Sequence, residues 1–408
     1  MSAIDTEIVD FSAALLLRYF RSGGLQDGDV SRLDHRRDLE LLTAYWALSE
    51  PVRRLVKHVL ERPHEAQALL RSQIRVDDAI ARGRIDARRT WLHRLQSGQP
   101  TAVVAHEPVR SFDTGPNLLL AWVLKEAGAY TARLLEWQTN SSPHLPQIEQ
   151  AQQDLRKVQR LEALRDPLRA VSLGRKPTAG AVREASRARR QIYRHAVDAF
   201  NVLRGLEMND PAAINTVARS AIIGPLEDWR RFELAVGLAI GEALGRTTGT
   251  GAQLHLLASK SSDPIVTAGR FAVYWQQTTS FYQSPPLEPS EERSQEALAA
   301  YDLAAGTERP DVVVVDRDLG TIVSVIEVKY IAGDTVTGRF REAVDQVVRY
   351  TRAYAPPASL DALLSNCIVA LTRDAPTMVQ DNGRAPLAID FNGIKQSGLD
   401  VWAARLVA

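Results

Sequence analysis

The chain has 408 residues, of which 45% are hydrophobic and 24% charged, and 50 Lys and Arg against 49 Asp and Glu give a formal net charge of +1. This composition is typical of a globular protein, and the length predicts two or three domains. The single cysteine, Cys367, excludes an intramolecular disulfide and a cysteine-based zinc site. We expect a cytoplasmic protein without a membrane partner, because no stretch is long and apolar enough to span a bilayer and the first residues lack a basic flank.

Three regions are expected along the chain. Residues 1–110 mix short amphipathic runs with glycine turns and are assigned to partner or DNA recognition. Residues 111–225 carry apolar side chains at three-to-four spacing, which predicts a mainly α-helical module. Within this module, residues 151–200 hold twelve basic against five acidic residues. A break at residues 174–180 predicts that these basic residues line one side of a long helical hairpin.

The third region, residues 226–408, has a different texture. It begins with a helix over 226–244 that Gly245 closes, and a second helix is expected over 338–354. Between and after these helices, short β-rich runs predict strands over 253–258, 270–278, 311–315, 322–330, 366–372 and 387–391. A loop over 284–309 with a short helix from about residue 290 separates the second strand from the third. This order predicts an α/β domain whose mixed sheet is flanked by helices.

Two neighbouring strands of this domain carry the strongest chemical signal. Glu327 and Lys329 lie two residues apart and therefore emerge on one face of their strand, while Asp311 begins the partner strand. An antiparallel register that sets the start of one strand beside the end of the other would bring the three side chains together. Two carboxylates and the main-chain carbonyl of Val328 suit Mg²⁺, which prefers oxygen ligands, and Lys329 would orient an attacking water.

These residues resemble the signature of the PD-(D/E)xK nucleases. Pro310-Asp311 is followed by Glu327-Val328-Lys329, and Glu233 lies on the preceding helix where many of these nucleases place another acid, although Glu242 competes for that role. Gln346 and Tyr350 reproduce the Gln-x-x-x-Tyr spacing of a subset of the family, which puts both on one helix face. The resemblance implies a restriction-endonuclease-like fold and a catalytic set of Asp311, Glu327, Lys329, Glu233, Gln346 and Tyr350.

A second resemblance lies further upstream. Arg82-Gly83-Arg84-Ile85-Asp86 with Thr90, and then Ser111-Phe112-Asp113-Thr114-Gly115-Pro116-Asn117-Leu118, are similar to a pattern in McrC-type restriction subunits. The turn reads Asp-Thr-Gly-Pro-Asn and departs from the usual Asp-Thr-Pro-Glu-Asn form. This resemblance implies the DNA-cleavage subunit of a bacterial defence system, driven by a separate McrB-like AAA+ NTPase. The sequence itself has no phosphate loop of the Gly-x-x-x-x-Gly-Lys-Ser/Thr type.

We therefore expect a Mg²⁺-dependent DNA endonuclease, with Mn²⁺ as a substitute metal, and a homo-oligomer or higher assembly is compatible with double-strand cutting. The proposed metal ligands are Asp311, Glu327 and the Val328 carbonyl. The basic run would supply DNA contacts, although it also fits a solvated face or a surface that docks an acidic partner. The residues proposed for these contacts are Arg175, Lys176, Arg187, Arg189 and Arg190.

Two alternatives stay open at this point. The first is a catalytically silent scaffold that keeps the nuclease fold to bind nucleic acid or a motor subunit. The second is a stand-alone nuclease that cuts RNA or branched or single-stranded DNA, because an active site that reads the phosphate does not fix the shape of its substrate.

Overall fold

A computed structural model describes residues 2–22, 38–81, 83–137, 144–255, 264–276, 309–333, 335–354, 359–379 and 383–408, together with the single positions 293, 296, 297 and 300. Arg82, the ends of the strands expected over 253–258 and 270–278, and nearly all of the loop expected over 284–309 lie outside these residues. None of the helices in the described ranges combines the length and apolarity that crossing a membrane requires.

Contacts between residues divide the chain into two compact units. Unit 1 contains residues 1–45, 134–148 and 205–408, and unit 2 contains residues 46–133 and 149–204. The division differs from the three consecutive regions expected from the sequence, because residues 3–22 pack with the C-terminal part of the chain. Periodicity reports how a segment folds locally and carries no signal for such a docking partner.

The core of unit 1 is a mixed sheet of seven strands among the described residues, in the order β10-β9-β8-β7-β6-β5-β4. Pairing is antiparallel from β4 to β8 and parallel from β8 to β10. The strands are β4 (Gln253–Leu254), β5 (Val266–Ala268), β6 (Phe271–Trp275), β7 (Val312–Asp316), β8 (Thr321–Lys329), β9 (Ile368–Leu371) and β10 (Leu387–Asp390). The mixed α/β architecture expected for this half of the chain is confirmed.

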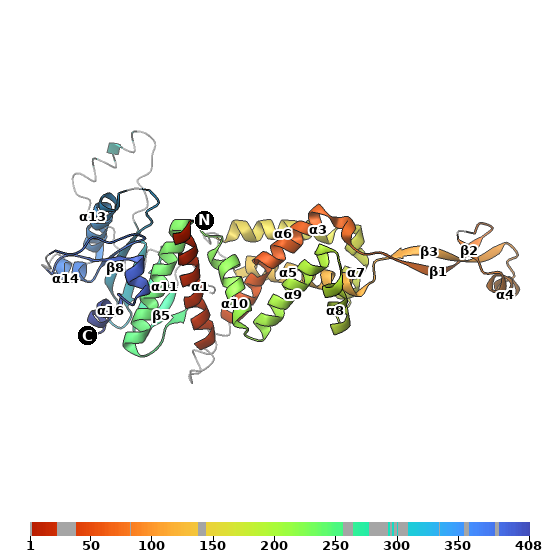
Figure 1. Cartoon of the computed structure of the whole chain (residues 1–408), viewed down its shortest axis with the longest axis horizontal. Helices are drawn as coiled ribbons and strands as arrows, with labels where there is room; N and C mark the ends of the chain where they lie inside the picture. Colours follow the sequence, from red (N-terminus) through yellow and green to blue (C-terminus); the bar gives the residue numbers. More distant parts are fainter. Residues whose placement is uncertain are drawn as a thin grey trace. The chain divides into compact units, whose positions relative to one another are not determined.

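Strand β7 lies between two helical layers. Its valines are all buried, as expected of a strand that is covered on both faces. Val313 and Val315 belong to a core cluster with α13 (Val336–Tyr354). Val312 has the opposite orientation, since a Cβ added to Gly237 of α11 (Asp228–Thr248) would lie 3.9 Å from its Cγ2 atom. Helices α11 and α13 therefore cover opposite faces of the sheet (Figure 1).

Helix α11 is longer than the sequence predicts. It continues through Gly245 to Thr248 and ends at Gly249, which adopts the left-handed conformation with φ 69°. Gly245 is needed for close packing instead, because a Cβ there would lie 2.7 Å from the nitrogen of Ala252. A glycine inside an apolar helix thus marks a close contact rather than the helix end.

Further helices surround α11 in unit 1. Helix α1 (Ala3–Ser22) packs along it, as do α16 (Asp400–Val407) and, through Phe391 and Phe232, the short helix α15 (Phe391–Lys395). Helix α10 (Pro211–Val217) runs into a π-helical stretch at Ala218–Ile223 that contacts α1. The short helix α14 (Leu360–Ser365) packs against α13 and β8.

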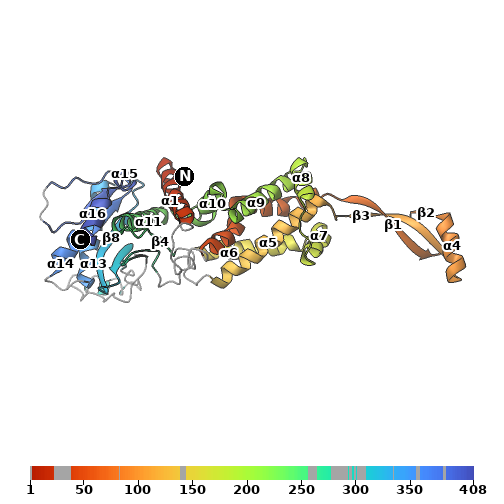
Figure 2. The same ribbon diagram turned by 90° about the horizontal axis from the view of Figure 1, so that it is seen from below.

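Unit 2 combines helices with an antiparallel ribbon. Its ribbon consists of β1 (Leu69–Asp78) and β3 (Ala102–Ser111), with the short strand β2 (Arg84–Ile85) beside β3. Figures 1 and 2 show α4 (Ala87–Ser97) at the end of this ribbon, away from the other helices of the unit. The helices near the base of the ribbon include α3 (Glu50–Glu61) and α5 (Gly115–Trp137).

The basic run does not form the expected long hairpin. It is divided over four helices: α6 (Leu145–Gln159), α7 (Glu162–Ser172), α8 (Ala179–Arg187) and α9 (Gln191–Glu207). Gly174, with φ 90°, follows α7, and Thr178 caps α8 by accepting a hydrogen bond from the amide of Ala181. A left-handed glycine thus follows one helix and a threonine N-cap begins the next, and the apolar period does not show either boundary.

Candidate active site

The β7–β8 hairpin brings the first two acidic candidates together. Val312 pairs with Ile326 in the antiparallel register, so Asp311, directly before β7, lies beside the end of β8. The amide of Val328 donates a hydrogen bond of 2.8 Å to Oδ2 of Asp311. The N–H and C=O groups of one strand residue point to the same edge, and the Val328 carbonyl therefore faces the side on which Asp311 lies.

Every residue selected for chemistry from the sequence lines one pocket of about 430 Å³ in unit 1. These residues come from α11, β7, β8 and α13, and they are Glu233, Asp311, Glu327, Val328, Lys329, Gln346 and Tyr350. Five further residues line the same pocket: Trp229, Gln276, Tyr330, Arg309 and Arg339. The sequence predicts that the first group lies together, and the catalytic roles of these residues stay predictions.

Lys329 is held by three oxygen acceptors. Its Nζ atom lies 2.9 Å from Oε1 of Glu327, 2.5 Å from Oε1 of Gln346 and 3.4 Å from Oε1 of Glu342. Burial lowers the pKa of Lys329, but the negative charges of Glu327, Glu342 and Asp311 outweigh this effect and raise the pKa. The pocket therefore contains a fixed ammonium group that stays charged.

Glu327 and Asp311 form a pair of acids, of which Glu327 is buried and Asp311 half-buried. Glu327 is 3% exposed, and its Oε2 atom has no hydrogen-bond partner among the described residues. Burial raises the pKa of Glu327 to about 8, with a further contribution from the charge of Asp311. Burial also raises the pKa of Asp311, against the opposing effect of the Val328 amide. A buried carboxylate oxygen of Glu327 without a hydrogen-bond donor from the described part of the chain, next to a second acid, costs folding free energy unless a proton or a cation occupies the site.

Glu233 is oriented by two side chains, that of the last residue of β6 and that of the residue directly after it. Trp275 Nε1 donates to Oε2 of Glu233 at 2.9 Å, and Gln276 Nε2 donates to the same oxygen at 2.6 Å. Burial and the charge of Asp311 raise the pKa of Glu233 to about 8. Glu242, the competing candidate, instead pairs with Arg18 and Arg246 and does not line the pocket. Glu233 is thus the acid of α11 that faces the other candidates.

The donor set fits a cation held by few protein ligands. Across the described ranges, no group of three or more His, Cys, Asp or Glu side chains has the arrangement of a metal site. Asp311 and Glu327 supply two carboxylates, and the Val328 carbonyl lies on the same side. Mg²⁺ is commonly held by one or two carboxylates and keeps several waters, so these three residues fit it.

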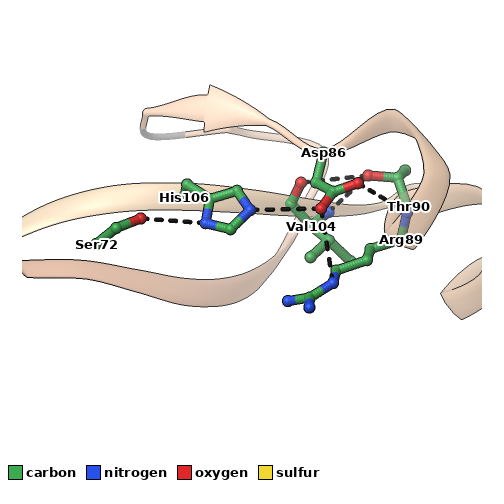
Figure 3. Close-up of polar contacts among 6 residues, drawn as sticks. All are labelled: Ser72, Asp86, Arg89, Thr90, Val104 and His106. Atoms are coloured by element: carbon green, nitrogen blue, oxygen red, sulfur yellow. Dashed lines mark hydrogen bonds and ion pairs between the residues drawn. The ribbon is translucent and has the colours of Figure 1, made fainter.

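A second polar cluster lies on the ribbon of unit 2 (Figure 3). Ser72 Oγ lies 3.1 Å from Nδ1 of His106, whose Nε2 atom lies 3.3 Å from Oδ2 of Asp86. Asp86 also caps α4 by accepting a hydrogen bond from the amide of Arg89, and Thr90 Oγ1 accepts one from the amide of Val104. Asp86 and Thr90, two residues of the McrC-like pattern, therefore fasten α4 to the ribbon.

The second part of that pattern is a buried turn at the start of α5. Asn117 is fully buried, and its amide nitrogen donates to the carbonyl oxygens of Gln67 and Phe112. Its Oδ1 atom accepts a hydrogen bond of 2.6 Å from the hydroxyl of Tyr193. These contacts give the turn a structural role, because they satisfy both ends of one buried amide.

The five basic residues proposed for DNA contacts lie in unit 2, whereas the pocket lies in unit 1. Arg175 forms an ion pair of 2.8 Å with Asp113, and Arg190 donates to the carbonyl of Glu65. Lys176, Arg187 and Arg189 are exposed. Two of the five side chains thus already have polar partners within unit 2, and DNA contact stays a prediction.

Sequence reasoning missed Gln276 and Arg309. Gln276 has a φ of 51°, a left-handed conformation that is uncommon for a residue other than glycine. No residue type or spacing in the sequence signals such a conformation at a glutamine. Arg309 directly precedes the Pro310-Asp311 pair, and that position is the only hint of its place in the pocket.

Comparison with known proteins gives little further information. No protein-family model matches the chain, and no curated protein matches it. A comparison with solved structures matches a refined half-complex from the tetradecameric assembly of Thermococcus gammatolerans McrB AAA+ hexamers with bound McrC. The likeness has 13% identity and a TM-score of 0.23, and it covers 86% of this chain and 65% of that chain. A likeness of this size carries no argument about fold or function.

Proposed function

We propose that this chain is a Mg²⁺-dependent DNA endonuclease with a restriction-endonuclease-like domain. The observation that carries the proposal is the convergence of Asp311, Glu327 and Lys329 in one pocket, where a buried carboxylate oxygen of Glu327 has no partner among the described residues. The seven-stranded mixed sheet of the described residues, with helices on both faces, supports this domain type.

Asp311, Glu327 and the carbonyl of Val328 would hold the metal. Bound Mg²⁺ supplies Lewis acidity, which polarises the phosphodiester and lowers the pKa of a water ligand. Binding requires both acids to be ionised, although burial favours their protonated forms. Metal binding therefore displaces a proton from the pocket, and we expect metal affinity to rise with pH up to about the pKa of Glu327.

Lys329 would orient the attacking water and offset negative charge that develops on the phosphate. Gln346 accepts a hydrogen bond from its ammonium group and so fixes the direction of the side chain. Glu233, held by Trp275 and Gln276, adds a third acidic group to the pocket wall. Tyr350 is 5% exposed and packs behind these groups, which gives it a positioning role.

We also propose that the chain acts as the cleavage subunit of a bacterial defence system together with an AAA+ NTPase. This part rests on the McrC-like residues, from Gly83 to Asp86 with Thr90 and from Ser111 to Leu118, and on the lack of a phosphate loop in the sequence. A partner that gates cleavage would protect the host, so we expect weak activity from the chain alone.

The test is plasmid cleavage with Mg²⁺ or Mn²⁺, in which wild type is compared with Lys329→Ala and Asp311→Ala, each with and without the NTPase encoded nearby. Glu242→Gln is the matched control, because it neutralises an acid of α11 outside the pocket. We expect both pocket variants to lose cleavage by at least about a hundredfold, since each removes a charge that acts in the transition state, and the control to cut like wild type.

The products and the substrate range separate the remaining alternatives. Metal-assisted attack by water leaves ends with a 5′-phosphate, which a ligase rejoins directly. If RNA or branched DNA is cut faster than duplex DNA, the assigned substrate changes and the assigned catalytic residues stay the same. If wild type and variants are equally inert in every condition while they still bind DNA or the NTPase, the scaffold alternative replaces the nuclease.

A further inference from the structure

Arg309 places a guanidinium group at the mouth of the acidic pocket. The residue before a proline favours an extended backbone, and residues two apart in an extended segment emerge on the same side. Arg309 and Asp311 are separated by Pro310, and both line the pocket. The Arg309 side chain is exposed, so it is accessible to a ligand that enters the pocket.

The other two cations of the pocket are occupied by acids. Lys329 contacts Glu327 and Glu342, and Arg339 pairs with Glu342 at 2.8 Å. Arg309 differs, because its hydrogen bonds among the described residues go to neutral groups: Nη1 donates to the carbonyl of Gln276 at 2.9 Å, and Nη2 donates to Oε1 of the same residue at 3.3 Å. Its charge also acts on Asp311 and opposes the effect of burial, which raises the pKa of that carboxyl, but the two residues form no ion pair. The remaining N–H donors of Arg309 are thus available to an anion.

Gln276 connects Arg309 to the acidic residues. Besides accepting both hydrogen bonds from Arg309, it donates its amide N–H to the carbonyl of Asp311 at 2.8 Å and its side-chain NH₂ to Glu233 at 2.6 Å. It does so in the left-handed backbone conformation. A residue other than glycine keeps that conformation only where its surroundings enforce it, and such positions cluster at functional sites.

We propose that Arg309 binds the phosphodiester backbone of the substrate at the pocket, through the non-bridging oxygens of a phosphate, and that Gln276 is the residue that positions it. A planar guanidinium matches a phosphate with two parallel hydrogen bonds. The pairing also reduces the repulsion between the substrate and the three acids Glu233, Asp311 and Glu327. This inference rests on the proposed nuclease function.

The first measurement is binding of a duplex DNA in a Glu327→Gln background without divalent metal, so that no DNA is cut. Arg309→Gln is compared with Arg317→Gln, the control, whose arginine also donates to a backbone carbonyl but does not line the pocket. Losing one phosphate contact should weaken binding about tenfold or more and reduce the slope of log K against log salt by about 0.9. Arg309→Lys, which keeps the charge but not the fork, should keep most of the slope.

The second measurement tests Gln276. Asparagine tolerates the left-handed conformation, so Gln276→Asn shortens the side chain without strain on the backbone. It removes the Oε1 contact with Arg309 but keeps the contact of the main-chain carbonyl. We expect it to weaken DNA binding in the same background by less than Arg309→Gln does, and to have little added effect in the Arg309→Gln protein, because it acts on DNA through Arg309. In proteins with Glu327 intact, Arg309→Gln should raise KM for cleavage more than it lowers kcat.

The outcomes separate this inference from the proposed function. If wild type cuts DNA and Asp311→Ala abolishes cutting, but Arg309→Gln matches Arg317→Gln in affinity, salt slope and KM, the phosphate-binding role is wrong and the nuclease stands. Additive effects of Gln276→Asn and Arg309→Gln would overturn the positioning role. If wild type neither cuts nor binds nucleic acid, both proposals are wrong.

Discussion

Replacing Glu327 by glutamine should stabilise the metal-free protein at pH 8. Burial and the charge of Asp311 raise the pKa of Glu327 from its ordinary value of 4.5 to about 8. Between these two values the folded state binds more protons than the unfolded state, so the free energy of unfolding falls as the pH rises through this window. Glutamine cannot ionise and does not incur this loss.

The size of the effect follows from the shift in pKa. Each pKa unit corresponds to about 1.4 kcal/mol, which sets a ceiling of about 4 to 5 kcal/mol for the cost of ionising Glu327 at pH 8. The substitution also removes the ion pair between Glu327 and Lys329, although Gln346 and Glu342 keep their contacts with the ammonium group. We therefore expect a net gain of about 1 to 3 kcal/mol at pH 8 and close to none at pH 5.

Thermal or urea unfolding in EDTA at pH 5 and pH 8 measures this difference. Glu342→Gln serves as the control, since it neutralises another acid that contacts Lys329, but one whose pKa is lowered rather than raised. Its removal should therefore bring no gain at pH 8. A Glu327→Gln protein that is no more stable than wild type at pH 8, or whose advantage does not change with pH, would refute the argument from buried acids.

Three further outcomes are expected. Mg²⁺ at a hundred times its Kd should stabilise wild type by about 2.7 kcal/mol in the same unfolding assay, and Glu327→Gln much less, because only wild type retains both carboxylates. Asn117→Ala should destabilise the protein by about 2 to 4 kcal/mol in urea, since it removes three hydrogen bonds of a fully buried amide, to Tyr193, Gln67 and Phe112; a loss below about 0.5 kcal/mol would contradict this. Gly241→Ala should lower the free energy of unfolding by about 1 to 3 kcal/mol, because its Cβ would lie 2.4 Å from Cγ1 of Val266. Thermal unfolding measures this, and an unchanged Tm would show that α11 can shift away from β5 without loss of stability.

The hairpin of the candidate site could be predicted from the sequence because its information is local. Val312 to Val315 form an apolar run, the turn follows at once, and the two-residue period of β8 puts Glu327 and Lys329 on one face. Such short-range patterns predict the hairpin and the shared face. The register that brings Asp311 to Val328 includes a shift between Val314 and Val315, which no residue pattern indicates.

Features that depend on tertiary packing were beyond the sequence. Glu233 and Glu242 lie on one helix, and only the ion pairs of Glu242 with Arg18 and Arg246 distinguish it from the acid of the pocket. The left-handed backbone of Gln276 is set by its contacts with Asp311, Glu233 and Arg309 rather than by its residue type. The docking of residues 3–22 on α11 was equally invisible, because the partner lies far along the chain.

That docking has a consequence for protein synthesis. Helix α1 is made before α11, against which it packs and which begins roughly 200 residues later. At about 5 to 20 residues per second, a ribosome needs on the order of 10 to 40 s to complete that interval. During it, α1 can contact only those segments of unit 1 that are already made, such as α10 and the π-helical stretch at Ala218–Ile223, and β7 and β8 do not yet exist. A nascent chain that ends within this interval therefore lacks the helix on which α1 packs and has no assembled pocket.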